Sequence, residues 1–311
     1  MGLREDDRTF SVAKLFFTYG CGGNLLWPWY AGASVILTAA PSRVATNLLE
    51  TIDRFKPTVF NGVPTSYASM MAVDRFTERY DLSSIRLCIS AGEALPVRIW
   101  HAWKERTGHE IAEGIGTTEN LALYLTNRPG DTRPGSTGKP VAGYEIKVVG
   151  EDGQPVAAGE TGNLIVRGET AALGYLHQYD KSRRTFLGEW LATGDRFRVD
   201  DDGYYWYVGR SDEMLKVGGI WVSPLEIENT LTGHEAVRES AVIGHRDQSD
   251  LVKPKAFVVL QPGYAPSEEM SRELIAHCTR ELAAFKRPRW IEFVDELPRT
   301  ATGKLQRSRL R

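Results

Sequence analysis

Apolar and polar positions follow three successive patterns along the chain. Between Phe10 and about Gly150, short β-branched runs such as Ser34–Thr38 and Thr58–Phe60 are separated by stretches with helical spacing, as in Asn47–Phe55. Another apolar run, Ile85–Ile89, precedes a turn and a further helical stretch. This alternation predicts an α/β layer with a mostly parallel sheet.

The second pattern begins at Gly138 and consists of short strand-like runs punctuated by Asp-Gly and Thr-Gly turns. The runs are EIKVVGEDGQPV, GETGNLIVRG, EWLATGDRFRV and GYYWYVGR. Such turns between alternating runs are typical of β-hairpins. They predict an antiparallel, β-barrel-like subdomain.

The third pattern follows Asp212 and mixes both periods. It contains a helix that starts at Pro224, strands in SAVIGH and KAFVVLQPG, an amphipathic helix over Ser271–Leu282 and a last strand at Ile291–Val294. The predicted fold class is therefore α/β. A partial large domain (residues 1–211), with a mostly parallel sheet and the barrel-like subdomain, is followed by a small α+β C-terminal domain (residues 212–311).

Composition excludes several classes of function. The 311 residues are 42% hydrophobic and 25% charged, which is ordinary for a globular protein, and the net charge of −2 lacks the basic surplus of a nucleic-acid-binding protein. No apolar span is long enough to cross a membrane, and the first residues do not resemble a signal peptide. Three widely spaced cysteines fit neither a disulfide framework nor a zinc site. We expect a cytoplasmic protein that binds neither nucleic acid nor membrane.

Polar residues with chemical potential gather in a few strings. In EGIGTTEN, Glu113–Asn120, the Thr118 hydroxyl can bond a phosphate oxygen, and Glu119 offers the single carboxylate that Mg²⁺ commonly takes. On these residues alone, a polar loop after a strand is an equally good interpretation. The string ATGD, Ala192–Asp195, indicates a hairpin bend whose Asp195 could accept hydrogen bonds from both hydroxyls of a ribose.

Two further strings lie near the C-terminus. In GRSDEMLKVGGIWVSPLEIE, Gly209–Glu228, the Arg210 guanidinium can bond ribose or phosphate through a fixed fork. Asp212 stands at the predicted domain boundary. In TATGK, Lys304 is a point charge on a flexible stem, suited to neutralising shifting negative charge. Taken singly, these strings are also compatible with a hairpin bearing surface ion pairs and with a frayed tail.

Together the strings resemble the nucleotide motif, hinge motif and C-terminal lysine of the adenylate-forming enzymes. That superfamily includes acyl- and aryl-CoA ligases, luciferases and peptide-synthetase adenylation domains, which convert a carboxylate and ATP into an acyl-adenylate. The resemblance implies an acid–thiol ligase that uses ATP, Mg²⁺ and CoA. It also implies rotation of the small domain about Asp212, and it allows a homodimer.

The resemblance assigns roles residue by residue. Catalytic roles fall on Lys304, Thr118 and Glu119, with Glu119 as the Mg²⁺ ligand. The implied ATP and AMP contacts are Gly92, Glu93, Glu113, Gly114, Ile115, Gly116, Thr118, Asp195, Arg210 and Lys304. The family usually has an aromatic residue where Ile115 stands, so adenine stacking would differ here. Gly218, Gly219 and Trp221 are the implied neighbours of the CoA pantetheine.

The aromatic-rich segment Lys14–Leu37 resembles the wall of the acyl pocket, and its nearest likeness is to the benzoate-CoA ligase branch. A buried amphipathic helix is the alternative for any one of its side chains. The resemblance implies an aromatic carboxylate as substrate and, as its contacts, Thr18, Tyr19, Gly92, Gly116 and Ala122. The benzoate branch has a histidine where Ala122 stands, so a smaller residue here would admit a substituted ring.

One family element has no match. The Ser/Thr/Gly-rich phosphate loop is missing, and the similar string RPGSTGKP, Arg133–Pro140, follows the nucleotide motif instead of preceding it. We therefore expect a truncated aryl-CoA ligase that lacks roughly 200 N-terminal residues of a typical member and adenylates poorly by itself. The alternatives are a ligase for a non-aromatic acid, an adenylation domain that feeds a carrier protein, and a non-catalytic nucleotide-binding remnant.

Overall fold

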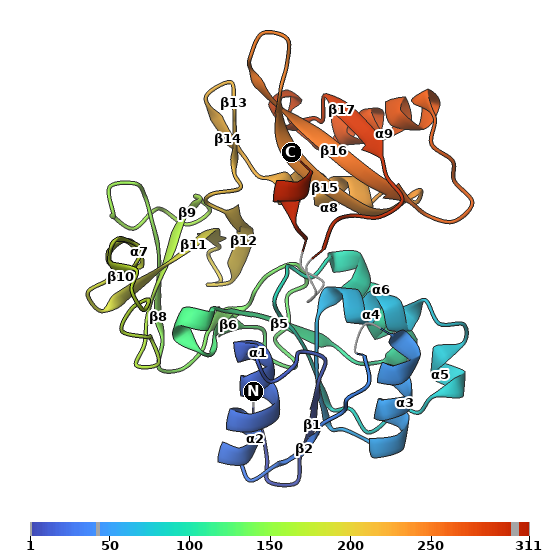
Figure 1. Ribbon diagram of the computed structural model, residues 1–311, viewed down its shortest axis with the longest axis vertical. Coiled ribbons are helices and arrows are strands. Elements are labelled where there is room, and N and C mark those ends of the chain that lie inside the picture. Colours follow the sequence, from blue (N-terminus) through green and yellow to red (C-terminus); the bar gives the residue numbers. More distant parts are fainter. Residues whose placement is uncertain (1, 42–43, 300–304, 311) are drawn as a thin grey trace. The chain divides into compact units, whose positions relative to one another are not determined.

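A computed structural model describes residues 2–41, 44–299 and 305–310 of the protein (Figure 1). The chain forms two compact units. One comprises Met1–Thr193 and Phe197–Tyr207, and the other comprises Gly194–Arg196 and Val208–Arg311. The hinge and domain boundary at Asp212 stay predictions.

The first unit is built on a seven-stranded sheet with the order β2-β1-β3-β4-β5-β6-β7. The pairs among β1 to β5 are parallel, whereas β5 with β6 and β6 with β7 are antiparallel pairs. This confirms the predicted mostly parallel sheet. The strands are β1 (Arg8–Ser11), β2 (Ser34–Ile36), β3 (Val59–Gly62), β4 (Leu87–Ser90), β5 (Ile111–Gly116), β6 (Leu123–Thr126) and β7 (Lys139–Pro140).

Helices α3, α4 and α6 pack on one face of this sheet (Figure 1). Their apolar stripes bury Phe60 of β3 and Cys88 of β4 in the main core of the unit. The predicted helix over residues 47–55 is present and ends where Lys56 turns left-handed before Pro57. The helices are α3 (Ala45–Phe55), α4 (Pro64–Met71), the short α5 (Phe76–Arg79) and α6 (Val97–Thr107).

The opposite face of the sheet meets the aromatic-rich segment. Three short helical pieces replace one continuous helix there: α1 (Thr18–Cys21), the π-helical η1 (Gly22–Leu26) and α2 (Trp27–Tyr30). Tyr19 and Trp27 pack against Val59 and Ile89 of the sheet. Because side chains alternate along a strand, β3 thus presents Phe60 to one layer and Val59 to the other.

A second sheet confirms the predicted hairpin region. Its order is β10-β11-β9-β8, and β12 pairs with β11. Alternate residues of β9 and β11 are buried, which places Leu164, Val166 and Phe197 in a common core. The elements are β8 (Glu145–Val149), β9 (Gly162–Arg167), α7 (Tyr179–Thr185), β10 (Phe186–Leu187), β11 (Trp190–Val199) and β12 (Tyr205–Arg210).

The second unit is the small α+β fold that the sequence predicts. Strands β15 and β16 form a long antiparallel pair, and β17 joins β16 in parallel. Helices α8 and α9 are capped by Ser223 and Ser267, whose hydroxyls accept backbone hydrogen bonds. The elements are β13 (Leu215–Val217), β14 (Ile220–Val222), α8 (Pro224–Thr232), β15 (Val237–Arg246), β16 (Val252–Leu260), α9 (Glu268–Glu281), β17 (Trp290–Phe293) and the short 3₁₀ helices η3 (Ala284–Lys286) and η4 (Arg307–Arg309).

Across the ranges that the structure describes, every helix is too short or too polar to cross a membrane.

Candidate functional site

The predicted nucleotide string begins inside the sheet. Glu113, Gly114, Ile115 and Gly116 belong to β5, and the loop interpretation of these four residues is therefore wrong. Pairing with β4 and β6 holds them in the sheet although two of the four are glycines. Only after Gly116 does the chain leave the strand, through the 3₁₀ helix η2 (Thr118–Asn120).

Glu113 lies buried beside the predicted adenine loop. Its Oε1 accepts a hydrogen bond of 3.0 Å from the Leu95 backbone N–H, in the loop that carries Gly92 and Glu93. Burial raises the pKa of the Glu113 carboxyl to about 8, although the Leu95 bond favours the ionised form. Glu113 therefore supports the loop from the core, and its predicted nucleotide contact would be made through this loop.

Thr118 and Glu119 follow the strand at its carboxyl end. The Thr118 hydroxyl is exposed and lies 3.5 Å from the hydroxyl of Thr18, which joins the predicted nucleotide and acyl segments. Glu119 accepts a 2.6 Å hydrogen bond at Oε1 from the Tyr175 hydroxyl. Its backbone carbonyl accepts another, of 2.7 Å, from Ala172.

Sequence reasoning missed Tyr175. This residue stands 56 positions after Glu119, and the chain between Arg167 and Tyr179 carries no regular pattern. The only signal is a tyrosine within a polar, glycine-containing loop. In the structure it holds one oxygen of the predicted metal ligand in place.

The residues around Glu119 fit an Mg²⁺ ion shared with a nucleotide. Tyr175 occupies Oε1 of Glu119, and among the described residues the structure records no bond to Oε2. No cluster of three or more His, Cys, Asp or Glu side chains that could hold a metal occurs in the described ranges. One carboxylate is what Mg²⁺ needs when phosphate oxygens and water complete its shell.

A cavity of about 200 Å³ lies on the sheet face opposite α3, α4 and α6. Ala122, one of the predicted substrate contacts, lines it. Thr18, Tyr19, Gly92 and Gly116 do not line this cavity. Its apolar wall is formed by Trp27, Val59, Ile89 and Leu123.

Two of those predicted contacts have other local tasks. The Tyr19 hydroxyl donates to the Gly62 carbonyl at 3.0 Å, so it is bonded within the protein, and burial raises the pKa of Tyr19 well above its ordinary range. A methyl group at Gly116 would lie 2.2 Å from the Ala122 carbonyl oxygen. Gly116 therefore permits the close approach that brings Ala122 beside the end of β5.

Asp195 and Arg210 form an ion pair. Asp195 lies within β11 and is nearly buried, so the predicted hairpin bend at Ala192–Asp195 is wrong. Arg210, at the end of β12, donates to Asp195 Oδ1 at 3.2 Å and to Asp212 Oδ1 at 3.3 Å. The structure thus brings together the predicted ribose anchor, nucleotide contact and hinge.

The predicted CoA neighbours form a hairpin. Gly218 and Gly219 are the two residues between β13 and β14, with φ of +57° and +86°. A turn of this kind requires left-handed backbone at both positions, which glycine adopts without strain. Trp221 is half exposed, with Lys216 Nζ 5.5 Å and Arg196 Cζ 5.9 Å from its ring centre.

Lys304 lies outside the described residues, but the chain on both sides is placed. Arg299 and Leu305 form an isolated antiparallel bridge. Arg307 donates to Glu228 Oε2 at 2.7 Å and to Glu213 Oε2 at 2.8 Å. Burial raises the pKa of Glu228, and Arg307 offsets part of that rise. The tail is therefore tied to α8 three residues after Lys304.

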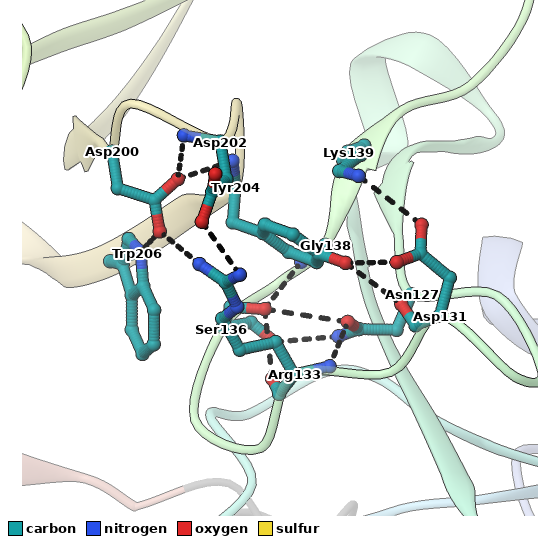
Figure 2. Close-up of polar contacts among 10 residues, drawn as sticks. All are labelled: Asn127, Asp131, Arg133, Ser136, Gly138, Lys139, Asp200, Asp202, Tyr204 and Trp206. Carbon is teal, nitrogen blue, oxygen red and sulfur yellow. Dashed lines mark hydrogen bonds and ion pairs between the residues drawn. The ribbon is translucent and has the colours of Figure 1, made fainter.

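The string RPGSTGKP has a structural task. Figure 2 shows Arg133 between two carboxylates, with 2.8 Å hydrogen bonds to Asp200 and Asp202 in the β11–β12 turn. Asp200 also accepts from the Trp206 indole at 2.8 Å. Four backbone amides of the string donate hydrogen bonds within the protein. The Arg133 amide donates to the Asn127 side chain, and the Ser136 amide donates to the Arg133 carbonyl. The Thr137 amide donates to the Tyr205 carbonyl, and the Gly138 amide donates to the Ser136 hydroxyl. These bonds brace the turn between β11 and β12 and occupy four amides of the string within the protein.

A parallel sheet whose carboxyl end carries Thr118 and Glu119, the Asp195–Arg210 pair and a small α+β unit are the features that the resemblance to the adenylate-forming enzymes predicts. The chain belongs to the family of AMP-binding enzymes. The profile of that family, described as "AMP-binding enzyme", matches residues 1–176, and "AMP-binding enzyme C-terminal domain" matches residues 226–304.

Several relatives are similar over the whole chain. The benzoate–CoA ligase of Thauera aromatica is 49% identical over 100% of this chain and 59% of its own length. The crystal structure of the anthranilate CoA ligase AuaEII in complex with anthranoyl-AMP matches with a TM-score of 0.94 and 62% identity, over 100% of this chain and 60% of that one. A benzoate CoA ligase from Burkholderia xenovorans LB400 matches with a TM-score of 0.93 and 48% identity, over 100% of this chain and 62% of that one. The chain thus spans about three-fifths of the length of the relatives it matches.

Proposed function

We propose that the chain is the larger part of an aryl-CoA ligase, which converts benzoate or a substituted benzoate, ATP and CoA into aroyl-CoA, AMP and pyrophosphate. The observation that carries the proposal is one short segment. Thr118 and Glu119 lie only four and three positions before Ala122, which lines a cavity of about 200 Å³. An apolar cavity of about 150 Å³ is enough to hold benzene, so the space suits a single substituted ring.

In the first step, a carboxylate oxygen of the aryl acid attacks the α-phosphorus of ATP. The bond from that phosphorus to the bridging oxygen breaks, and pyrophosphate leaves with the electron pair. We assign Asp195 to the ribose hydroxyls, Arg210 to the nucleotide, and the Thr118 hydroxyl to an α-phosphate oxygen. Lys304 would neutralise the charge that moves from carboxylate to phosphate. Glu119 would hold Mg²⁺, which, when bound, offsets the negative charge of the phosphates.

In the second step, the CoA thiolate attacks the carbonyl carbon of the aroyl-adenylate. The bond from carbonyl carbon to phosphate oxygen breaks, AMP leaves, and the thiol proton is released to solvent. Gly218, Gly219 and Trp221 are proposed to lie beside the pantetheine. A rotation about Asp212 between the two steps belongs to the same proposal. A homodimer and a cytoplasmic location stay predictions.

The second step offers the sharper experiment, because it uses no β- or γ-phosphate. The purified chain is incubated with synthetic benzoyl-AMP and CoA, and benzoyl-CoA is measured by mass spectrometry. Acetyl-AMP serves as the non-aromatic control. We expect enzyme-dependent benzoyl-CoA that falls at least about tenfold when Asp195 is replaced by alanine. Equal rates with acetyl-AMP would contradict the aryl assignment, and absence of any thioester would contradict the ligase assignment.

A further inference from the structure

One polar side-chain atom in the cavity wall has no hydrogen-bond partner among the described residues. Asn61 lies on β3, is 1% exposed, and its Oδ1 accepts no hydrogen bond from any described residue. The backbone of the same residue is satisfied, since its carbonyl accepts a 3.0 Å bond from Val12. The unpaired atom therefore belongs to the side chain alone, and that side chain lines the cavity.

The fold holds Asn61 on the cavity side of the sheet. Phe60 precedes it and is buried in the core on the helical side, so the alternation of a strand directs Asn61 to the opposite face, together with Val59. Gly23 packs against the Asn61 amide, and a methyl group at position 23 would lie 3.0 Å from Asn61 Nδ2. The absence of a side chain at Gly23 therefore leaves space for the Asn61 amide.

The hydroxyl groups in the cavity wall already have partners. The Thr9 hydroxyl donates to Asn24 Oδ1 at 3.4 Å, and the Thr126 hydroxyl lies 3.0 Å from its nearer acceptor, the Asn127 carbonyl. The Tyr144 hydroxyl is hydrogen-bonded to that of Thr170 at 2.7 Å. The rest of the wall is mostly apolar. Among the described side chains of this wall, Asn61 Oδ1 is therefore the buried acceptor for which the structure records no hydrogen bond.

We infer that Asn61 determines specificity by accepting a hydrogen bond from an amino or hydroxyl group on the ring of the aryl acid. This inference rests on the proposed function and names its substrate class: aminobenzoates or hydroxybenzoates rather than benzoate. A buried acceptor without a partner is costly, and a ring that supplies the donor removes that cost while an unsubstituted ring cannot. Ala122, being small, leaves the cavity open to the extra group.

The test compares ligands that differ only in the donor. Binding of 2-, 3- and 4-aminobenzoate, the three hydroxybenzoates, the three fluorobenzoates and benzoate to the chain is measured by calorimetry in the presence of AMP. A fluorine occupies the same ring position but offers no hydrogen. We expect at least one amino or hydroxy isomer to bind about tenfold or more tightly than both benzoate and the fluoro compound of the same position.

Asn61→Leu and Thr9→Val form a matched pair of variants. Asn61→Leu removes the unpaired amide oxygen and keeps the branched shape of the side chain, so the ratio between the affinities of donor and fluoro ligands should fall to near one. Thr9→Val removes a hydroxyl that is already bonded within the protein and should preserve the ratio. Near-ultraviolet circular dichroism checks that both variants fold. If Asn61→Leu does not fold, the comparison of donor and fluoro ligands on the wild-type chain still tests the inference.

Three outcomes would separate the inference from the proposed function. Tight binding of benzoate and fluorobenzoates, equal to that of the donor compounds, would overturn the role of Asn61 and leave the aryl site intact. The role of Asn61 is likewise overturned if a folded Asn61→Leu variant keeps the wild-type ratio. Failure of every aryl acid to bind would count against the proposed function itself.

Discussion

The pH dependence of stability should centre on Glu113. This carboxyl is buried in β5, and burial raises its pKa to about 8 from an ordinary 4.5. It is therefore protonated in the folded protein at neutral pH, whereas the unfolded chain ionises it above about pH 4.5. The folded state binds this proton more tightly than the unfolded chain. The contribution of Glu113 to the free energy of unfolding is therefore fully present below pH 4.5 and is lost as the pH rises through 8.

The size of the effect follows from the two pKa values. Each pH unit between them is worth about 1.4 kcal/mol, so the loss reaches about 5 kcal/mol above pH 8. Glu113→Gln keeps the shape of the side chain and an acceptor for the Leu95 N–H but cannot ionise. Between pH 5 and pH 9 the variant should lose about 4 kcal/mol less of its free energy of unfolding than the wild type.

Urea unfolding at a series of pH values, followed by tryptophan fluorescence, measures this difference. Six of the eight tryptophans, all except Trp221 and Trp290, lie in the first unit with Glu113. Glu110→Gln is the control, because the hydrogen bond from Lys104 lowers the pKa of Glu110. Replacing the Glu110 carboxyl should therefore not reproduce the gain in stability at high pH that we expect for Glu113→Gln. Parallel stability curves for wild type and Glu113→Gln from pH 5 to pH 9 would refute the reasoning.

Three further changes test other parts of the site. Tyr175→Phe frees Oε1 of Glu119 and should weaken Mg²⁺-dependent ATP binding at least about tenfold, as measured by calorimetry. Binding of AMP without metal should stay unchanged. An equal loss of affinity for both ligands would contradict the role of Tyr175 in positioning Glu119. Asp195→Ala removes the proposed ribose acceptor, and AMP affinity should fall about tenfold. Unchanged AMP affinity would contradict the assignment of Asp195 to the ribose. Arg307→Met leaves Glu228 buried without its ion pair and should lower the free energy of unfolding by about 3–5 kcal/mol in urea. Adding Glu228→Gln should restore part of that loss, and no restoration would contradict the pairing.

The layer architecture could be predicted from the sequence because each period is local. Helical spacing over residues 47–55, the Pro224 start and the alternating runs after Gly138 all identify elements that the structure contains. The strand character of Glu113–Gly116 could not be predicted, because two glycines weaken the local preference and neighbouring strands supply the pairing. The strand position of Asp195 is hidden for the same reason, since β11 continues through an Ala-Thr-Gly sequence.

Contacts between residues far apart in the sequence also could not be predicted. The hydrogen bond from Tyr175 to Glu119 joins residues 56 positions apart, and no local sequence pattern indicates it. Asn61 resembles any polar residue in a short strand, and only the packing of both sheet faces shows that its amide oxygen is buried without a partner among the described residues. Single-residue roles of this kind depend on tertiary packing, which periodicity does not encode.

The central claim is that this chain carries an aryl-adenylate site. Calorimetric titration of the chain with a non-hydrolysable aroyl-adenylate, the aroyl-sulfamoyl adenosine of 2-aminobenzoate, tests it most directly. We predict one site per chain and binding at least about a hundredfold tighter than that of AMP or 2-aminobenzoate alone, because the linked halves fill both parts of the site. Binding no tighter than that of AMP alone would contradict it.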